Sequence, residues 1–126
     1  MTKIFLVDDE PLVLIGMQGM LNWAELGYTV VGTARNGAEA LKAIGETYPD
    51  IVVSDIRMPV MDGLAATQAI RELPRPDSAV VPILAMSANA FDEDKKLAYG
   101  AGMSGYIVKP IDVQVLIQEL ERLEKQ

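Results

Sequence analysis

Charged and hydroxyl residues follow the apolar runs of this chain at positions where they can act together. Asp8 and Asp9 come directly after one apolar run, Asp55 closes another, Ser87 ends another, and Lys109 follows the last. Uninterrupted apolar runs are typical of parallel strands that are buried on both faces. Because ligands bind beyond the carboxyl ends of such strands, these side chains predict a charged pocket at the rim of a sheet.

The carboxylates indicate a site for a hard cation. If the strands before Asp8 and Asp55 are neighbours, Asp8, Asp9 and Asp55 converge, and without a counter-charge they repel one another. An oxygen site with few carboxylates suits Mg²⁺, which retains several waters. A cation here favours phosphoryl chemistry, in which Asp55 attacks phosphorus and forms an aspartyl phosphate. The Ser87 hydroxyl and the Lys109 ammonium can then bind phosphoryl oxygens.

Each of these residues also has an ordinary structural explanation. An aspartate after a strand is often a turn former or a helix cap, a serine such as Ser87 is often a turn residue, and a lysine such as Lys109 is often a solvated surface charge. The hypothesis of chemistry therefore depends on the whole set, since every candidate falls at the carboxyl end of an expected strand.

Composition and charge exclude several classes of function. The formal net charge is -7 and no Lys- or Arg-rich run offsets it, which argues against direct binding of nucleic acid. The absence of Cys excludes thiolate catalysis, and the absence of His excludes Ser-His-Asp triads and a phosphohistidine on this chain. The sequence has no secretion-signal pattern and no apolar run near the roughly 18 residues of a membrane span. We therefore expect a cytoplasmic protein without membrane contact.

Expected strands and helices alternate along the chain, which predicts βαβ units in one parallel sheet with right-handed crossovers. The length of 126 residues suits a single domain over 1–126 with no output domain. The expected strands are 3–7, 28–34, 51–54, 82–86 and 105–108. The expected helices are 10–23, 36–47, 64–73, 92–100 and 112–124.

Local signals within these elements predict helix starts, loops and one buried face. Asn36, Asp62 and Asp112 are expected helix caps. Pro59 with Gly63, and the segment 74–78, are expected loops. In the second helix Ala40, Leu41 and Ile44 are expected to point inward. The first helix has apolar or small residues at roughly helical spacing. They are Leu12, Ile15, Gly16, Gly19 and Met20.

The chain resembles the receiver domain of two-component response regulators over essentially its whole length. The resemblance rests on four motifs in this order and spacing. They are Val7-Asp8-Asp9-Glu10; Asp55-Ile56-Arg57-Met58-Pro59 with Met61-Asp62-Gly63; Ala85-Met86-Ser87-Ala88; and Val108-Lys109-Pro110. The resemblance implies a flavodoxin-like, doubly wound α/β fold, with a five-stranded parallel sheet of order 2-1-3-4-5 and five helices.

The resemblance also implies a role for each site residue. Asp55 would accept a phosphoryl group from a phosphohistidine on a histidine kinase or a histidine phosphotransfer domain. Asp8, Asp9 and Asp55 would hold Mg²⁺ with the backbone carbonyl of Arg57, and Ser87 and Lys109 would contact the phosphoryl group. Such a domain is not an enzyme acting on a separate substrate; it carries out Mg²⁺-dependent self-phosphorylation and autodephosphorylation at Asp55.

A conformational switch is implied by the same resemblance. Phosphorylation would draw Ser87 inward, Tyr106 would change rotamer, and the face formed by the fourth helix, fifth strand and fifth helix would be remodelled, with dimerisation as one outcome. From the sequence alone, Tyr106 equally fits a half-buried core aromatic. The Lys109–Pro110 bond is expected to be cis.

Some positions leave alternatives open. The family positions of Arg57 and Asn89 tune the loss of the acyl phosphate, and Arg57 can alternatively pair with Glu10. The amino-terminal half is similar to receivers attached to transcription regulators, whereas the segment from Pro74 to Asp112 is similar to receivers fused to hybrid sensor kinases. In either case, an output domain in a longer chain is expected.

Two other classes of function compete with the phosphorylated switch. One is an aspartate-nucleophile phosphatase, whose nucleophile commonly lies in an Asp-x-Asp motif after the first strand. Here that position reads Asp8-Asp9-Glu10-Pro11, which does not match. The other is an interaction module that binds partners through the fourth helix regardless of phosphate. Steady turnover of a phosphate ester would favour the first, and partner affinity independent of phosphorylation would favour the second.

Overall fold

A computed structural model describes residues 1–57, 61–73, 80–88 and 92–125 of the chain. Five strands and five helices alternate along these residues: β1 (Thr2–Val7), α1 (Pro11–Met20), β2 (Tyr28–Ala34), α2 (Gly37–Thr47), β3 (Ile51–Asp55), α3 (Gly63–Arg71), β4 (Ile83–Ser87), α4 (Asp92–Gly100), β5 (Gly105–Val108) and α5 (Val113–Glu124). None of the helices within these ranges combines the length and the apolar character that crossing a membrane requires. The expected loops at Pro59 and 74–78 lie outside the described residues.

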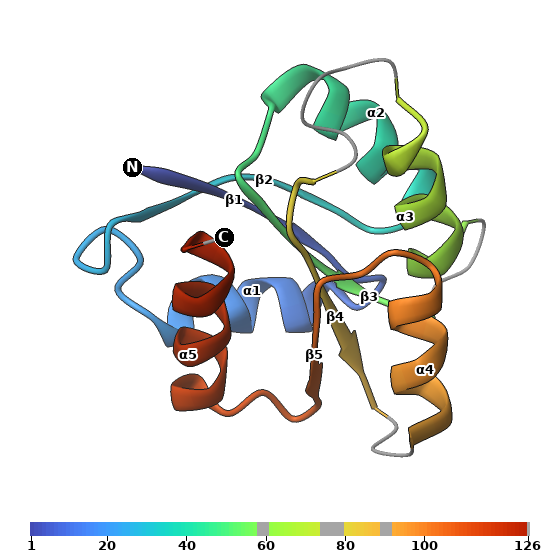
Figure 1. The fold of residues 1–126 in the computed structure, drawn as a ribbon. Coiled ribbons are helices and arrows are strands. Elements are labelled where there is room, and N and C mark those ends of the chain that lie inside the picture. Colours follow the sequence, from blue (N-terminus) through green and yellow to red (C-terminus); the bar gives the residue numbers. More distant parts are fainter. Residues whose placement is uncertain (58–60, 74–79, 89–91, 126) are drawn as a thin grey trace.

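The strands form one parallel sheet in the order β2-β1-β3-β4-β5. Strand order therefore reverses at β1, because the chain moves to β2 on one side of β1 and to β3 on the other. In Figure 1, α1 and α5 lie on one side of the sheet, and α2, α3 and α4 lie on the other. The predicted doubly wound, flavodoxin-like fold and its strand order are confirmed.

Two apolar clusters, one on each face, hold the layers together. Successive strand residues point to opposite faces, so Ile4 and Leu6 pack with the helices α1 and α5, whereas Phe5 and Val7 pack with α2, α3 and α4. All four of these side chains are buried. This explains why the central strands read as continuous apolar runs: β3 and β4 are buried at every residue, because helices cover both faces of the sheet.

Side-chain caps fix the starts of three helices, as predicted. Asn36 accepts a hydrogen bond from the backbone N–H of Glu39 at the start of α2. Asp62 caps α3 in the same way, and Asp112 caps α5. A cap satisfies backbone donors that have no partner within the helix, so these residues set where each helix begins.

The residues that α1 buries are not those whose spacing indicated the helix. The helix buries Leu14 and Met17, whereas Leu12 and Ile15 are 81% and 65% exposed. Because α1 is apolar on nearly all sides, its periodicity does not single out one stripe, and contact with the sheet decides which residues are buried. The helix also ends at Met20, three residues before the predicted end.

The carboxyl ends of two strands extend further than predicted. β3 includes Asp55 and β4 includes Ser87. Within the sheet, Asp55 lies opposite Met86 and Ser87 lies opposite Val108. The backbones of both site residues are therefore held by strand pairing, which makes their positions more rigid than a loop would.

Candidate functional site

The sheet brings Asp8, Asp55 and Lys109 together at its carboxyl edge, close to the point where strand order reverses. Asp8 follows β1, Asp55 ends β3, and Lys109 follows β5. The Lys109 Nζ atom lies 2.6 Å from Asp8 Oδ2 and 3.3 Å from Asp55 Oδ2. One ammonium group thus bridges two carboxylates that are 101 and 54 residues away in the sequence.

A close backbone approach at Gly63 supports Asp55 from behind. The Gly63 N–H donates to the Ile56 carbonyl at 3.1 Å. A Cβ atom placed on Gly63 would lie 2.1 Å from the backbone oxygen of Asp55. Only glycine fits this contact, so the first residue of α3 has a structural requirement that fixes the end of β3.

Burial and charge perturb the two ionisable groups at the centre of the site. Asp55 is 7% exposed. Burial raises the pKa of its carboxyl, Lys109 opposes this rise, and Asp8 adds to it. Burial by itself would lower the pKa of Lys109, but its hydrogen bond to Asp8 and the attraction of Asp55 outweigh burial and raise the pKa. The site therefore keeps a charged lysine beside Asp55, whose ionised form is destabilised by burial.

Three consecutive acidic residues can hold a metal ion. Carboxylate oxygens of Asp8, Asp9 and Glu10 lie within 4.8 Å of one another. Asp8 is fully buried, Asp9 is partly buried and Glu10 is exposed, so the group opens from the core toward solvent. The Glu10 N–H also donates to Asp8 Oδ1 at 2.9 Å, which holds that carboxylate in place.

Asp55 is not a member of this acidic group. Within the part of the chain that the structure describes, the cluster contains Asp8, Asp9 and Glu10. The Lys109 ammonium bridges Asp8 and Asp55 instead. Sequence reasoning did not single out Glu10 as a metal ligand, although its position directly after two aspartates was the available signal.

A second charged contact joins the ends of β3 and β4 to α4. Arg57 Nη2 lies 2.5 Å from Asp94 Oδ1, and the Ser87 hydroxyl donates to Asp94 Oδ2 at 2.9 Å. The hydrogen bond from Arg57 is the main reason that the pKa of Asp94 is lowered, despite burial, which raises it. Arg57 thus pairs with Asp94, and the alternative pairing with Glu10 is wrong. Sequence reasoning missed Asp94, because an acidic residue near a helix start usually faces solvent.

Tyr106 has the partly buried position expected of a half-buried aromatic. It lies opposite Ala85 in the sheet and packs against the cluster beneath α2, α3 and α4. The predicted cis bond between Lys109 and Pro110 is confirmed. Asn89 lies outside the described residues.

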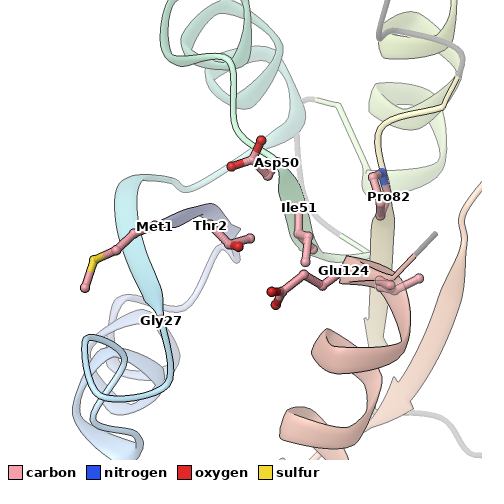
Figure 2. Close-up of a pocket in the computed structure, with 8 residues that line it drawn as sticks. Met1, Thr2, Gly27, Asp50, Ile51, Pro82 and Glu124 are labelled. Carbon is pink, nitrogen blue, oxygen red and sulfur yellow. The ribbon is translucent and has the colours of Figure 1, made fainter.

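Two cavities lie at different ends of the sheet. A cavity of about 490 Å³ at the amino ends of the strands is lined by residues that include Asp50 and Glu124 (Figure 2). Asp50 accepts a hydrogen bond from the Lys3 N–H, and burial together with Glu124 raises the pKa of Tyr28. This cavity lies at the opposite edge of the sheet from Asp8, Asp55 and Lys109.

The other cavity, of about 470 Å³, lies beside Lys109. It is lined mainly by apolar side chains of α1 and of the segment that follows β5, among them Met17, Met20 and Ile111. It thus places an apolar groove next to the charged site.

Comparison with known proteins places the chain among signalling proteins. Residues 4–121 match the response regulator receiver domain family. The uncharacterized transcriptional regulatory protein YesN of Bacillus subtilis is 39% identical over 98% of this chain, and sensor histidine kinase RcsC of Escherichia coli is 36% identical over 97%. The chain spans 32% and 12% of these two relatives, so it corresponds to one part of each.

Solved structures give the same result. The receiver domain of sensor histidine kinase PA1611 from Pseudomonas aeruginosa, which holds a magnesium ion in its active site cleft, is 33% identical with a TM-score of 0.85. The match covers 99% of this chain and 98% of that domain. With its strand order and its four motifs, the chain belongs to the response regulator receiver domain family.

Proposed function

We propose that this domain is a phosphoacceptor switch in which Asp55 receives a phosphoryl group from the phosphohistidine of a partner protein. The observation that carries the proposal is the position of Lys109, whose ammonium lies between Asp8 and Asp55. An ammonium beside a nucleophilic carboxylate can neutralise phosphoryl oxygens during transfer. The histidine must lie on another molecule or another domain, since residues 1–126 contain none.

In this transfer the Asp55 carboxylate is the nucleophile and the phosphohistidine is the in-line donor. An Asp55 carboxylate oxygen attacks phosphorus, an O–P bond forms, and the P–N bond to the histidine breaks. The electron pair of that bond leaves with the imidazole, which can then take up a proton. Burial helps, because it holds Asp55 poorly solvated and therefore reactive. Hydrolysis of the acyl phosphate by water returns Asp55 to its starting state.

Mg²⁺ fits the acidic group beside this nucleophile. Asp8, Asp9 and Glu10 supply hard oxygen ligands, which Mg²⁺ prefers. Bound there, the ion would supply positive charge to the phosphoryl oxygens. The PA1611 receiver domain holds magnesium in its own cleft, which supports the same ion here. We also propose Asp55 and the backbone carbonyl of Arg57 as ligands in the metal-loaded protein.

Labelling with a small phosphodonor tests the proposal directly. Acetyl phosphate with MgCl2 should add one phosphoryl group to the protein, detected as a mass increase, and Asp55→Asn should abolish it. Asp50→Asn is the matched control, because Asp50 immediately precedes the same strand at its opposite end. A wild-type protein that remains unlabelled, or an Asp55→Asn variant that is labelled equally, would contradict the proposal. Continuous turnover of a phosphate ester would support the phosphatase instead.

The apolar groove beside Lys109 gives a protein donor a place to dock. Leu12 and Ile15 extend the apolar surface of α1 toward solvent, at 81% and 65% exposure. Exposed apolar surface of this kind is typical of interaction sites. We propose that a histidine kinase or a phosphotransfer domain packs on α1 and presents its phosphohistidine to Asp55.

Substitution of Ile15 separates docking from chemistry. Ile15→Ser should slow phosphoryl transfer from a phosphorylated phosphotransfer domain by about tenfold, the usual scale for losing one apolar anchor. Transfer from acetyl phosphate should be unchanged, because a small donor needs no docking surface. Val115→Ser, an exposed change on α5, serves as the control. Equal slowing with both donors would refute docking on α1.

The output side of the switch is proposed for α4, β5 and α5. Apolar side chains are exposed on all three elements, with Leu97 and Tyr99 on α4, Val108 on β5 and Val115 on α5. Phosphorylation would change this face through Ser87 and Tyr106, and a dimer or an output domain would read the change. Dimerisation measured by sedimentation with and without beryllofluoride tests this step, and partner binding that ignores beryllofluoride would favour the phosphate-independent module. We place the protein in the cytoplasm, where a kinase partner would meet it.

A further inference from the structure

Asp94 is a buried carboxylate that the phosphorylation chemistry leaves without a role. It lies in the first turn of α4 and its side chain is 1% exposed. Burying a carboxylate is costly unless both oxygens are paired, and here Arg57 and Ser87 pair with one oxygen each. The carboxylate therefore joins three elements, since Arg57 follows β3, Ser87 ends β4 and Asp94 belongs to α4.

The contact with Ser87 has a consequence for phosphoryl binding. A serine hydroxyl carries a single proton that it can donate, and Ser87 donates it to Asp94 Oδ2. While the proton is held there, the hydroxyl cannot donate it to an oxygen of a phosphoryl group on Asp55. A phosphoryl group must therefore displace this hydrogen bond before Ser87 can bind it.

We propose that Asp94 is a positioning residue that competes with the phosphoryl group for the Ser87 hydroxyl and so weakens phosphoryl binding at Asp55. The inference rests on the proposed function, because it takes the group bound beside Asp55 to be a phosphoryl group. Arg57 completes the arrangement. Its guanidinium neutralises Asp94 from the solvent side, with 67% of its own side chain exposed.

Asp94→Asn is an informative variant because it changes the partners without changing the shape. A carboxylate has two acceptor oxygens, whereas an amide has one acceptor and one donor group. Arg57 is only a donor, so it takes the amide oxygen and Ser87 then faces the amide NH₂. The Ser87 proton is released, and the serine oxygen can accept instead.

The dissociation constant for beryllofluoride, a phosphoryl analogue, measures the effect. Beryllium chloride, fluoride and MgCl2 are titrated into the protein, and fluorine NMR separates bound from free species. Asp94→Asn should bind beryllofluoride about fivefold more tightly than wild type, because charge-assisted hydrogen bonds are about twice as strong as neutral ones. In a Ser87→Ala background, Asp94→Asn should change the dissociation constant by less than about twofold.

Controls separate this coupling from charge and from folding. Glu93→Gln removes the same charge from the exposed neighbouring position on α4 and should leave the constant unchanged. If Asp94→Asn does not fold, Asp94→Ala is measured in the same two backgrounds. An equal effect with and without Ser87, or weaker binding in the variant, would overturn the inference. A wild-type protein that binds no beryllofluoride would instead contradict the proposed function.

Discussion

Removal of the ammonium at the centre of the site should destabilise the protein in a way that depends on pH. In Lys109→Met, the apolar stem is largely preserved but Asp8 and Asp55 lose their counter-charge. Asp8 is fully buried, and leaving a buried charge unpaired typically costs about 3–5 kcal/mol. Protonating an aspartate at pH 7 removes the unpaired charge at a cost of about 4 kcal/mol. The loss of stability therefore cannot much exceed that cost.

Two features of the structure reduce the expected loss of stability further. Asp8 keeps its hydrogen bond from the Glu10 N–H, and 15% of the Lys109 side chain is exposed, so the pair is not completely dry. We therefore expect a loss of about 2–3 kcal/mol at pH 7 without divalent cations. For a chain of this length that corresponds to a fall in Tm of about 8–12 °C.

Urea unfolding followed by the fluorescence of Trp23 measures the change. Trp23 is the single tryptophan and is buried against Tyr28, with ring centroids 6.3 Å apart. In EDTA, Lys109→Met should lose stability, and MgCl2 should restore more of it in the variant than in wild type, because a cation replaces the missing ammonium.

Dependence on pH tests the electrostatic origin of the loss. In the variant the group that opposes the raised pKa of Asp55 is gone, so the folded-state pKa of Asp55 lies further above its unfolded value and stability increases as the pH falls through that folded-state pKa. The difference in the free energy of unfolding between Lys109→Met and wild type should therefore shrink toward pH 5. Lys96→Met, an exposed change on α4, should cost less than about 0.5 kcal/mol. A Lys109→Met variant as stable as wild type at pH 7 in EDTA, or a gap that does not change with pH, would refute the reasoning.

Three further changes test other parts of the structure. Burial raises the pKa of Asp55, so the stability of the wild type falls as the pH rises through that pKa. Asp55→Asn should therefore be about 1 kcal/mol more stable than wild type at pH 7 in EDTA, typical of a relieved functional site. The two proteins should be equally stable at a pH below the ordinary range of aspartate. Gly63→Ala places a methyl group against the Asp55 backbone oxygen and should cost about 1–3 kcal/mol in urea unfolding, with slower labelling by acetyl phosphate. Stability within about 0.5 kcal/mol of wild type would show that the backbone adjusts. Tyr28→Phe removes a buried hydroxyl whose pKa is raised by burial and by Glu124, and it should cost about 1 kcal/mol of stability without any change in phosphorylation.

The fold could be read from the sequence because both faces of the sheet are covered. Covered strands appear as continuous apolar runs, and the capping residues Asn36, Asp62 and Asp112 mark the helix starts between them. The face of α1 could not be read in the same way. Its sequence is apolar nearly all round, so only tertiary contact selects Leu14 and Met17 for burial.

The candidate site was predictable where chemistry and strand position coincide. Asp8, Asp55 and Lys109 each stand at the end of an apolar run, and parallel pairing brings such ends to the same edge of the sheet. The contact of Asp94 with Ser87 has no comparable signal, because it depends on how α4 packs over the ends of β3 and β4. A polar residue in a polar helix gives no sequence pattern that distinguishes a buried partner from a solvated one.

The balance of charge around Lys109 connects stability to function. One ammonium bridges two carboxylates, and Asp9 and Glu10 add negative charge beside them. The site therefore carries more negative than positive charge. The raised pKa of Asp55 reflects its burial and the negative charge of Asp8, which together outweigh the opposing effect of Lys109. A cation bound by the acidic group would reduce this excess, whereas a phosphoryl group adds negative charge to it. It follows that the phosphorylated state should need the cation more than the unmodified state does, so phosphoryl binding and metal binding should strengthen each other.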